Sequence, residues 1–128
     1  MIQTILVIDN DYIFSTLVKL VLEQVTNWKI LTALDSKEGI ALAKLYQPSA
    51  ILLDIVLPNL NGLEIYYLLK SQPNTCFIPI IVTTAMAEIK EILADRVFED
   101  IEVIIKPFDL MTLKSQVIDV CDRDRNNG

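Results

Sequence analysis

Four short apolar runs in this sequence each end at a residue that can take part in chemistry. Two of these residues are carboxylates, Asp9 and Asp54; the others are a hydroxyl, Thr84, and an ammonium, Lys106. A continuous apolar run this short is typical of a strand buried on both faces, as in a parallel sheet. In parallel α/β sheets the ligand site forms outside the carboxyl ends of the strands. We therefore expect the four side chains to meet at one edge, where they would suit a divalent metal ion and a phosphoryl group.

The elements that must position these residues alternate along the whole chain. Periodicity and turn residues predict strands at 5–8, 28–33, 50–53, 80–82 and 103–105, and helices at about 12–25, 36–46, 63–71, 86–97 and 110–122. Five strands and five helices in strict alternation indicate a three-layer α/β fold with a parallel sheet.

Three aspartates stand where predicted helices begin. Asp11, Asp35 and Asp109 are each of the type that favours the N-cap position, where a side-chain oxygen accepts a backbone N–H. The first helix also carries an apolar stripe that we expect to be buried, made of Phe14, Leu17, Val18, Val21, Leu22 and Val25.

Composition narrows the class of protein. The chain has 128 residues, 52% of them hydrophobic, no histidine and a net charge of −6 without a cluster of Lys and Arg. Nucleic acid binding by this chain alone is therefore not expected, and neither is histidine-based catalysis.

No apolar run is long enough to span a membrane, and the first strand begins too near Met1 for a signal peptide. Cys76 and Cys121 lack metal-ligand spacing, which favours free thiols in a cytoplasmic protein. We expect one domain over 1–122 and a polar tail over 123–128.

The segments that carry these residues resemble the receiver domain of two-component response regulators, the class that includes chemotaxis regulators. The matching segments are ILVIDND at 5–11, LLDIVLPNLNG at 52–62, TA at 84–85 and KPF at 106–108. They follow the order of the family and cover nearly the whole chain. The resemblance implies a doubly wound, flavodoxin-like (βα)5 fold with strand order 2-1-3-4-5. It also implies a phosphoryl donor, either a histidine kinase or a histidine phosphotransfer protein, and output through contact with another protein, which the sequence does not identify.

Matching motif positions imply a magnesium site. Asp54 corresponds to the phosphoacceptor and a metal ligand, Asp9 to a ligand carboxylate, Asn10 to the second acidic position and the backbone carbonyl of Val56 to a further ligand. Carboxylate and carbonyl oxygens are the ligands that Mg²⁺ prefers. The metal is needed because a carboxylate nucleophile meets a phosphoryl group that is itself negative.

Two further positions match contacts to the phosphoryl group. Lys106 supplies a compact positive charge, and the hydroxyl of Thr84 can donate a hydrogen bond to a phosphoryl oxygen. Transfer then depends mainly on positioning and charge stabilisation. In this interpretation the chain is a phosphoacceptor and is not an enzyme that turns over a substrate.

Two departures from the family pattern leave an alternative open. Asn10 puts a neutral oxygen where the family has a carboxylate, which should weaken metal binding. Val103 stands where the family often has Tyr or Phe coupled to the threonine, so an aromatic switch is in doubt. The chain could therefore be a degenerate receiver that binds a partner without being phosphorylated.

A different enzyme class also fits part of the sequence. The Asp9-Asn10-Asp11 cluster resembles the opening motif of haloacid dehalogenase-like phosphatases, with Asp9 as nucleophile and Asp11 as general acid–base, and with Thr84 and Lys106 as the later motifs. That interpretation leaves Asp54 unexplained, and the sequence after Lys106 lacks the acidic pair of that family. Each of these candidate site residues could instead have only a structural role; Asp11, for example, could be the N-cap of the first helix.

Overall fold

The computed structural model describes residues 3–55, 62–84, 101–106 and 109–127. The elements in chain order are β1 (Thr4–Ile8), α1 (Tyr12–Val25), β2 (Lys29–Ala33), α2 (Ser36–Tyr46), β3 (Ala50–Asp54), α3 (Gly62–Ser71), β4 (Ile80–Thr84), β5 (Glu102–Ile105) and α5 (Leu110–Asn127). All five predicted strands are present within two residues of their expected bounds. The helix predicted at 86–97 lies outside the described residues.

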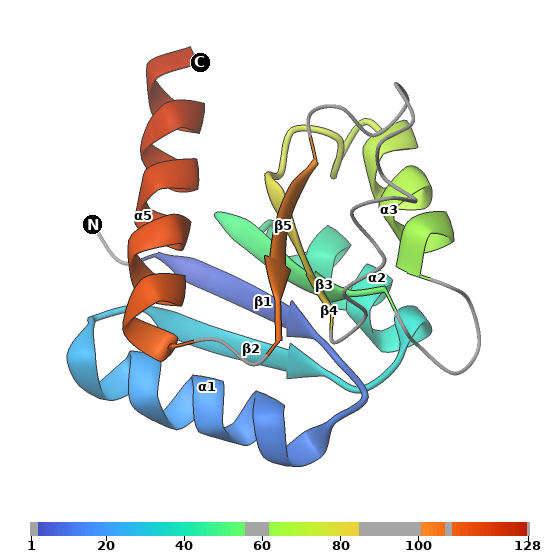
Figure 1. The fold of residues 1–128 in the computed structure, drawn as a ribbon. Coiled ribbons are helices and arrows are strands. Elements are labelled where there is room, and N and C mark those ends of the chain that lie inside the picture. Colours follow the sequence, from blue (N-terminus) through green and yellow to red (C-terminus); the bar gives the residue numbers. More distant parts are fainter. Residues whose placement is uncertain (1–2, 56–61, 85–100, 107–108, 128) are drawn as a thin grey trace.

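The strands of the described chain form one parallel sheet in the order β2-β1-β3-β4-β5. This is the predicted order, and it confirms the doubly wound α/β fold. Helices α1 and α5 cover one face of the sheet, and α2 and α3 cover the other (Figure 1). None of the described helices combines the length and the apolar character that crossing a bilayer requires.

Each face of the sheet has its own apolar core, and β1 contributes to both. Ile5 and Val7 pack with residues of α1 and α5, whereas Leu6 and Ile8 pack with residues of α2 and α3. Successive side chains of a strand point to opposite faces, so a central strand covered on both sides must be apolar throughout. This is the physical reason for the short continuous apolar runs in the sequence.

The buried face of α1 differs from the predicted stripe. Val18 and Leu22 are buried as expected, but Leu17 and Val25 are 50% and 44% exposed. The face is centred on Val18, so Ser15, three residues before it, is buried instead. Among the residues that the structure describes, no group forms a hydrogen bond with Ser15 Oγ.

Helix α1 also occupies the free edge of β2, the outer strand of the sheet. Glu23 Oε1 accepts the Ile30 N–H at 3.0 Å, and Lys19 Nζ donates to the Ile30 carbonyl at 3.0 Å. The hydrogen bond from Ile30, with help from Lys19, lowers the pKa of Glu23. A lowered pKa in the folded state means that this contact stabilises the fold at neutral pH and is lost as the pH falls through that pKa. The contacts cover backbone groups that an exposed edge would offer to another strand.

The predicted helix caps are confirmed. Asp11 Oδ1 accepts the Phe14 N–H at 3.0 Å, Asp35 Oδ1 accepts the N–H of residue 38 at 2.8 Å, and Asp109 Oδ1 accepts the N–H of residue 111 at 3.2 Å. Neither Cys76 nor Cys121 forms a disulfide in the described part of the chain, as expected.

The end of the last helix was predicted wrongly. Helix α5 continues to Asn127, five residues beyond the predicted end at about 122, so the polar residues 123–127 are helical. Polarity alone suggested a tail, but no proline or glycine interrupts the segment before Gly128. A polar segment joined to an existing helix needs no new nucleation, so it can extend that helix.

Candidate functional site

Strand register brings the two predicted carboxylates to the same level of the sheet. Strands β1 and β3 are paired in parallel with Ile8 beside Leu53, so the next residues, Asp9 and Asp54, follow side by side at the carboxyl edge. Both are buried, with relative exposures of 0% and 7%. The sequence placed these residues correctly because parallel strands end at a common edge.

Strands β4 and β5 place the hydroxyl and the ammonium at the same edge. Thr84 pairs with Ile105, and the backbone N–H of Lys106 donates to the Thr84 carbonyl at 2.7 Å. Thr84 is fully buried. The end of β5, and with it the start of the lysine side chain, is therefore fixed to the end of β4.

The Lys106 ammonium joins the two carboxylates. Its Nζ lies 2.6 Å from Asp9 Oδ2 and 3.3 Å from Asp54 Oδ2, and the lysine side chain is only 16% exposed. Three charged groups from three strands thus meet in one place, although Asp9 and Lys106 are 97 residues apart in the sequence. Charge-assisted contacts of this length are among the stronger hydrogen bonds in proteins.

Two buried carboxylates of the described residues contact the same ammonium. Carboxylate oxygens are ligands that Mg²⁺ prefers, so a cation could also bind beside Asp9 and Asp54. No group of three or more Asp, Glu, Cys or His side chains with metal-binding geometry occurs in the described ranges. Within these ranges the structure provides one pair of acidic groups at the edge of the sheet, Asp9 and Asp54.

The residues after Asp9 have different roles. The second oxygen of Asp9, Oδ1, accepts the Asp11 N–H at 2.9 Å, which fixes the carboxylate orientation. Asn10 is exposed. The Asp11 carboxylate caps α1 through Phe14, as its structural interpretation predicted. The Asp11 carboxylate is thus engaged in helix capping.

Phe14 is part of the cluster and was not predicted to be. The Lys106 Nζ lies 4.1 Å from the centroid of the Phe14 ring, within the range of a cation–π contact. Sequence analysis assigned Phe14 only to the buried stripe of α1. Its position in the first turn after the acidic cluster was a signal, but only the fold brings residue 106 above the ring.

Val56 and Val103 are the two remaining positions that the sequence analysis singled out. The predicted carbonyl ligand Val56 lies outside the described residues. Val103 pairs with Val82 on β4 and packs against a small apolar cluster of Ile55 and Val82. Position 103 is therefore an apolar packing position, with no aromatic ring.

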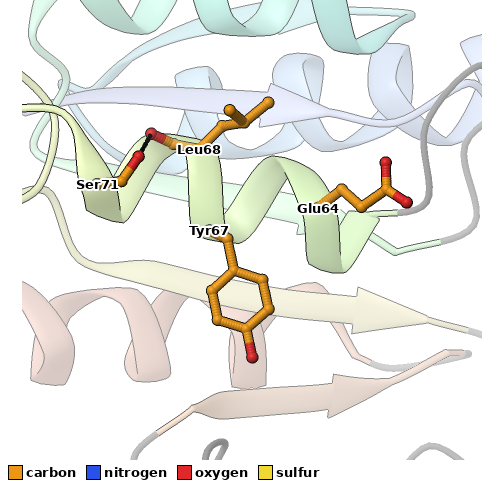
Figure 2. Close-up of a pocket in the computed structure, with 4 residues that line it drawn as sticks. All are labelled: Glu64, Tyr67, Leu68 and Ser71. Carbon is orange, nitrogen blue, oxygen red and sulfur yellow. Dashed lines mark hydrogen bonds between the residues drawn. The ribbon is translucent and has the colours of Figure 1, made fainter.

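A depression of about 370 Å³ also lies along α3. Its described lining consists of Glu64, Tyr67, Leu68 and Ser71. Figure 2 shows Tyr67 and Leu68 leaving the helix in different directions, and Ser71 Oγ donating to the Leu68 carbonyl, at 2.9 Å. None of the predicted site residues is among these four described lining residues.

Comparisons with known proteins agree with the fold. The family described as the response regulator receiver domain matches residues 5–118. The chain is 32% identical over 113 residues to the DNA-binding dual master transcriptional regulator RpaA of Synechocystis sp., covering 88% of this chain and 46% of RpaA. It is also 32% identical over 91 residues to the response regulator ArlR of Staphylococcus aureus, covering 71% of this chain and 40% of ArlR. The chain thus spans less than half the length of these relatives.

Solved structures show the same fold. A CheY-like response regulator receiver domain protein from Methanospirillum hungatei superimposes with a TM-score of 0.86 at 23% identity, covering 100% of both chains. The chemotaxis protein CheY4 of Vibrio cholerae gives a TM-score of 0.83 at 22% identity, covering 94% of this chain and 99% of CheY4.

The site and the fold define a flavodoxin-like α/β domain with an acidic cluster at the carboxyl edge of its sheet. The chain belongs to the receiver domain family of two-component response regulators. This membership sets aside the haloacid dehalogenase-like alternative, in agreement with the capping role of Asp11.

Proposed function

We propose that this chain is a phosphoacceptor whose acceptor is Asp54, and that its phosphoryl donor is a phosphohistidine on a histidine kinase or a histidine phosphotransfer protein. The observation that carries the proposal is the contact of one lysine with two buried carboxylates at the ends of adjacent strands. Two carboxylates and one ammonium at the carboxyl edge of the sheet are the groups with which a site could receive a cation and a phosphoryl group.

In the proposed transfer, a carboxylate oxygen of Asp54 attacks the phosphorus atom. The bond between phosphorus and the donor histidine nitrogen breaks as the bond to Asp54 forms, and the histidine nitrogen keeps the electron pair. Lys106 lies beside Asp54 and is held by strand pairing, so its charge can stabilise the negative phosphoryl oxygens without reorganisation. The Thr84 hydroxyl, at the end of the adjacent strand, is proposed as a hydrogen-bond donor to a third phosphoryl oxygen.

The donor set fits Mg²⁺. Asp9 and Asp54 would supply two carboxylate oxygens, and Asn10 and the carbonyl of Val56 are proposed as neutral ligands, with water and phosphate oxygen completing the shell. When bound, the cation would neutralise part of the charge between the attacking carboxylate and the phosphoryl group. Asp9 is already oriented by the Asp11 N–H, so its remaining oxygen, now held by Lys106, is the one that a metal would share.

The proposed role is signalling, with no turnover of a separate substrate. Output would pass through contact of the phosphorylated domain with another protein, in the cytoplasm, where cysteines such as Cys76 and Cys121 stay reduced. Binding to nucleic acid or to membranes is not part of the proposed role of this domain.

Exposure to a small acyl phosphate tests this proposal. With Mg²⁺ present, intact-mass measurement should show the addition of one phosphoryl group, and chelation of the metal should prevent it. No addition under either condition would instead support the degenerate receiver, which binds its partner without phosphorylation. Addition that is independent of Mg²⁺ would contradict the assigned metal role.

Asn10→Asp should tighten Mg²⁺ binding. Adding one negative charge near a divalent cation should stabilise binding by roughly 1–2 kcal/mol, about 5- to 30-fold in Kd. Calorimetry is the suitable measurement of Mg²⁺ affinity. The fluorescence of Trp28 should not report on the site, because Trp28 precedes β2 at the amino end of the sheet, opposite the site, and is buried in the core that α1 and α5 share.

The matched control for this prediction is Asn27→Asp, which adds the same charge at an exposed position on the amino side of the sheet. This control should leave the affinity nearly unchanged. If Asn10→Asp binds Mg²⁺ no more tightly than the control, residue 10 does not face the metal.

A further inference from the structure

We propose that Phe14 is a positioning residue that holds the Lys106 ammonium at the site through a cation–π contact. The expected effect on the rate of phosphoryl transfer rests on the proposed function, whereas the contact between Phe14 and Lys106 does not. The ring centroid lies 4.1 Å from Lys106 Nζ, so the ammonium has an aromatic partner in addition to Asp9 and Asp54.

Phe14 differs from Asp9 and Asp54, the other two partners of the ammonium, because metal binding and phosphoryl transfer would not draw it away. Both carboxylates are proposed metal ligands, and Asp54 is also the proposed nucleophile, so a metal and a phosphoryl group would draw these oxygens away from the ammonium. The face of Phe14 takes no part in either step. It attracts the cation through the negative face of its ring and cannot accept a proton from it. Phe14 would therefore keep the ammonium in place while the carboxylates change partners.

The fold fixes the ring independently of the lysine. Phe14 lies in the first turn of α1, where its N–H is bound to the Asp11 carboxylate, and its side chain packs against the core that α1 and α5 share. The lysine backbone is fixed separately through the Thr84 carbonyl. Ring and ammonium are thus placed by two different elements, and the contact restricts a long side chain that otherwise has considerable rotamer freedom.

The contact is tested first without any phosphorylation. In proton–carbon NMR spectra of the protein, the methylene protons next to Lys106 Nζ should be shifted upfield by the ring current, and Lys106→Met should identify the signal by removing it. Phe14→Leu should move the signal to the ordinary lysine position. A signal at the ordinary position in the unmodified protein would overturn the proposed contact, whether or not the chain is phosphorylated.

The effect on transfer is tested by the rate of Mg²⁺-dependent phosphorylation with a small acyl phosphate. Phe14→Leu, which keeps an apolar side chain but removes the aromatic face, should slow the reaction about 2- to 30-fold, the range that a cation–π contact supports. Phe14→Tyr keeps the face and should restore most of the rate. Phe77→Leu, the same substitution at an exposed loop position, is the matched control and should leave the rate unchanged.

A double-mutant cycle separates positioning from a general loss of structure. In a Lys106→Met background, Phe14→Leu should have little further effect on the residual rate, because the ring acts only through the ammonium. An equal slowing in both backgrounds, or a Phe14→Tyr variant as slow as Phe14→Leu, would overturn the proposal. If the unmodified protein is not phosphorylated at all, the proposed function fails, and the NMR result alone decides the contact.

Discussion

Asp54→Asn should reduce phosphorylation by an acyl phosphate to background, while Asp9→Asn should retain it at a higher Mg²⁺ concentration. Asparagine at position 54 preserves shape and burial but removes the nucleophilic carboxylate oxygen. At position 9 the same change removes only a metal ligand. The loss of a ligand should weaken Mg²⁺ binding by at least the roughly 10- to 100-fold typical of outer-shell partners. The measurement is the initial rate of phosphoryl incorporation over a Mg²⁺ titration.

The two variants form a matched pair, because both replace a buried carboxylate that contacts the same ammonium. Both should therefore change the lysine environment in a similar way, and only the nucleophile separates them. Retention of full incorporation in Asp54→Asn together with its loss in Asp9→Asn would contradict the assignment and revive the phosphatase interpretation.

Gly39→Ala should destabilise the domain by about 1–3 kcal/mol, the usual cost of overpacking a core. In the middle of a helix this substitution normally stabilises by up to about 1 kcal/mol. Here a Cβ on residue 39 would lie 2.6 Å from Ile8 Cδ1 and 2.8 Å from Ile8 Cγ1. Ile8 is fully buried on β1, directly before Asp9, so it has little room to move. Urea unfolding followed by circular dichroism measures the change in the free energy of unfolding.

Ile8→Val supplies the control, since it removes the atom nearest to the added Cβ. The double variant should lose less stability than the sum of the two single variants, because the clash is shared between them. A gain in stability from Gly39→Ala alone would show that α2 does not approach β1 as closely as the structure places it.

The sequence predicted the architecture well because the physical signals are local. The apolar runs reveal strands buried on both faces, and the aspartates at helix starts identify the caps. The predicted strand order came from family resemblance. The position of Asp9 beside Asp54 followed from the general rule that parallel strands end at one edge.

What the sequence could not predict depends on side-chain geometry. The contact between Phe14 and Lys106 joins residues that are far apart in the chain, and nothing in the local pattern of α1 distinguishes a ring that faces a cation from one that only fills the core. The exposure of Leu17 follows from how α1 is rotated on the sheet, which apolar periodicity determines only roughly. The extension of α5 beyond residue 122 could not be predicted from polarity, because a polar segment can either fray or continue the helix to which it is joined.

The central claim, that Asp54 receives the phosphoryl group, is tested most directly by locating the modified residue. After reaction with an acyl phosphate and Mg²⁺, hydride reduction converts an aspartyl phosphate to homoserine, which peptide mass spectrometry can assign to one position. The account predicts homoserine at position 54 and aspartate unchanged at positions 9 and 11. Homoserine at position 9, with position 54 unmodified, would contradict it.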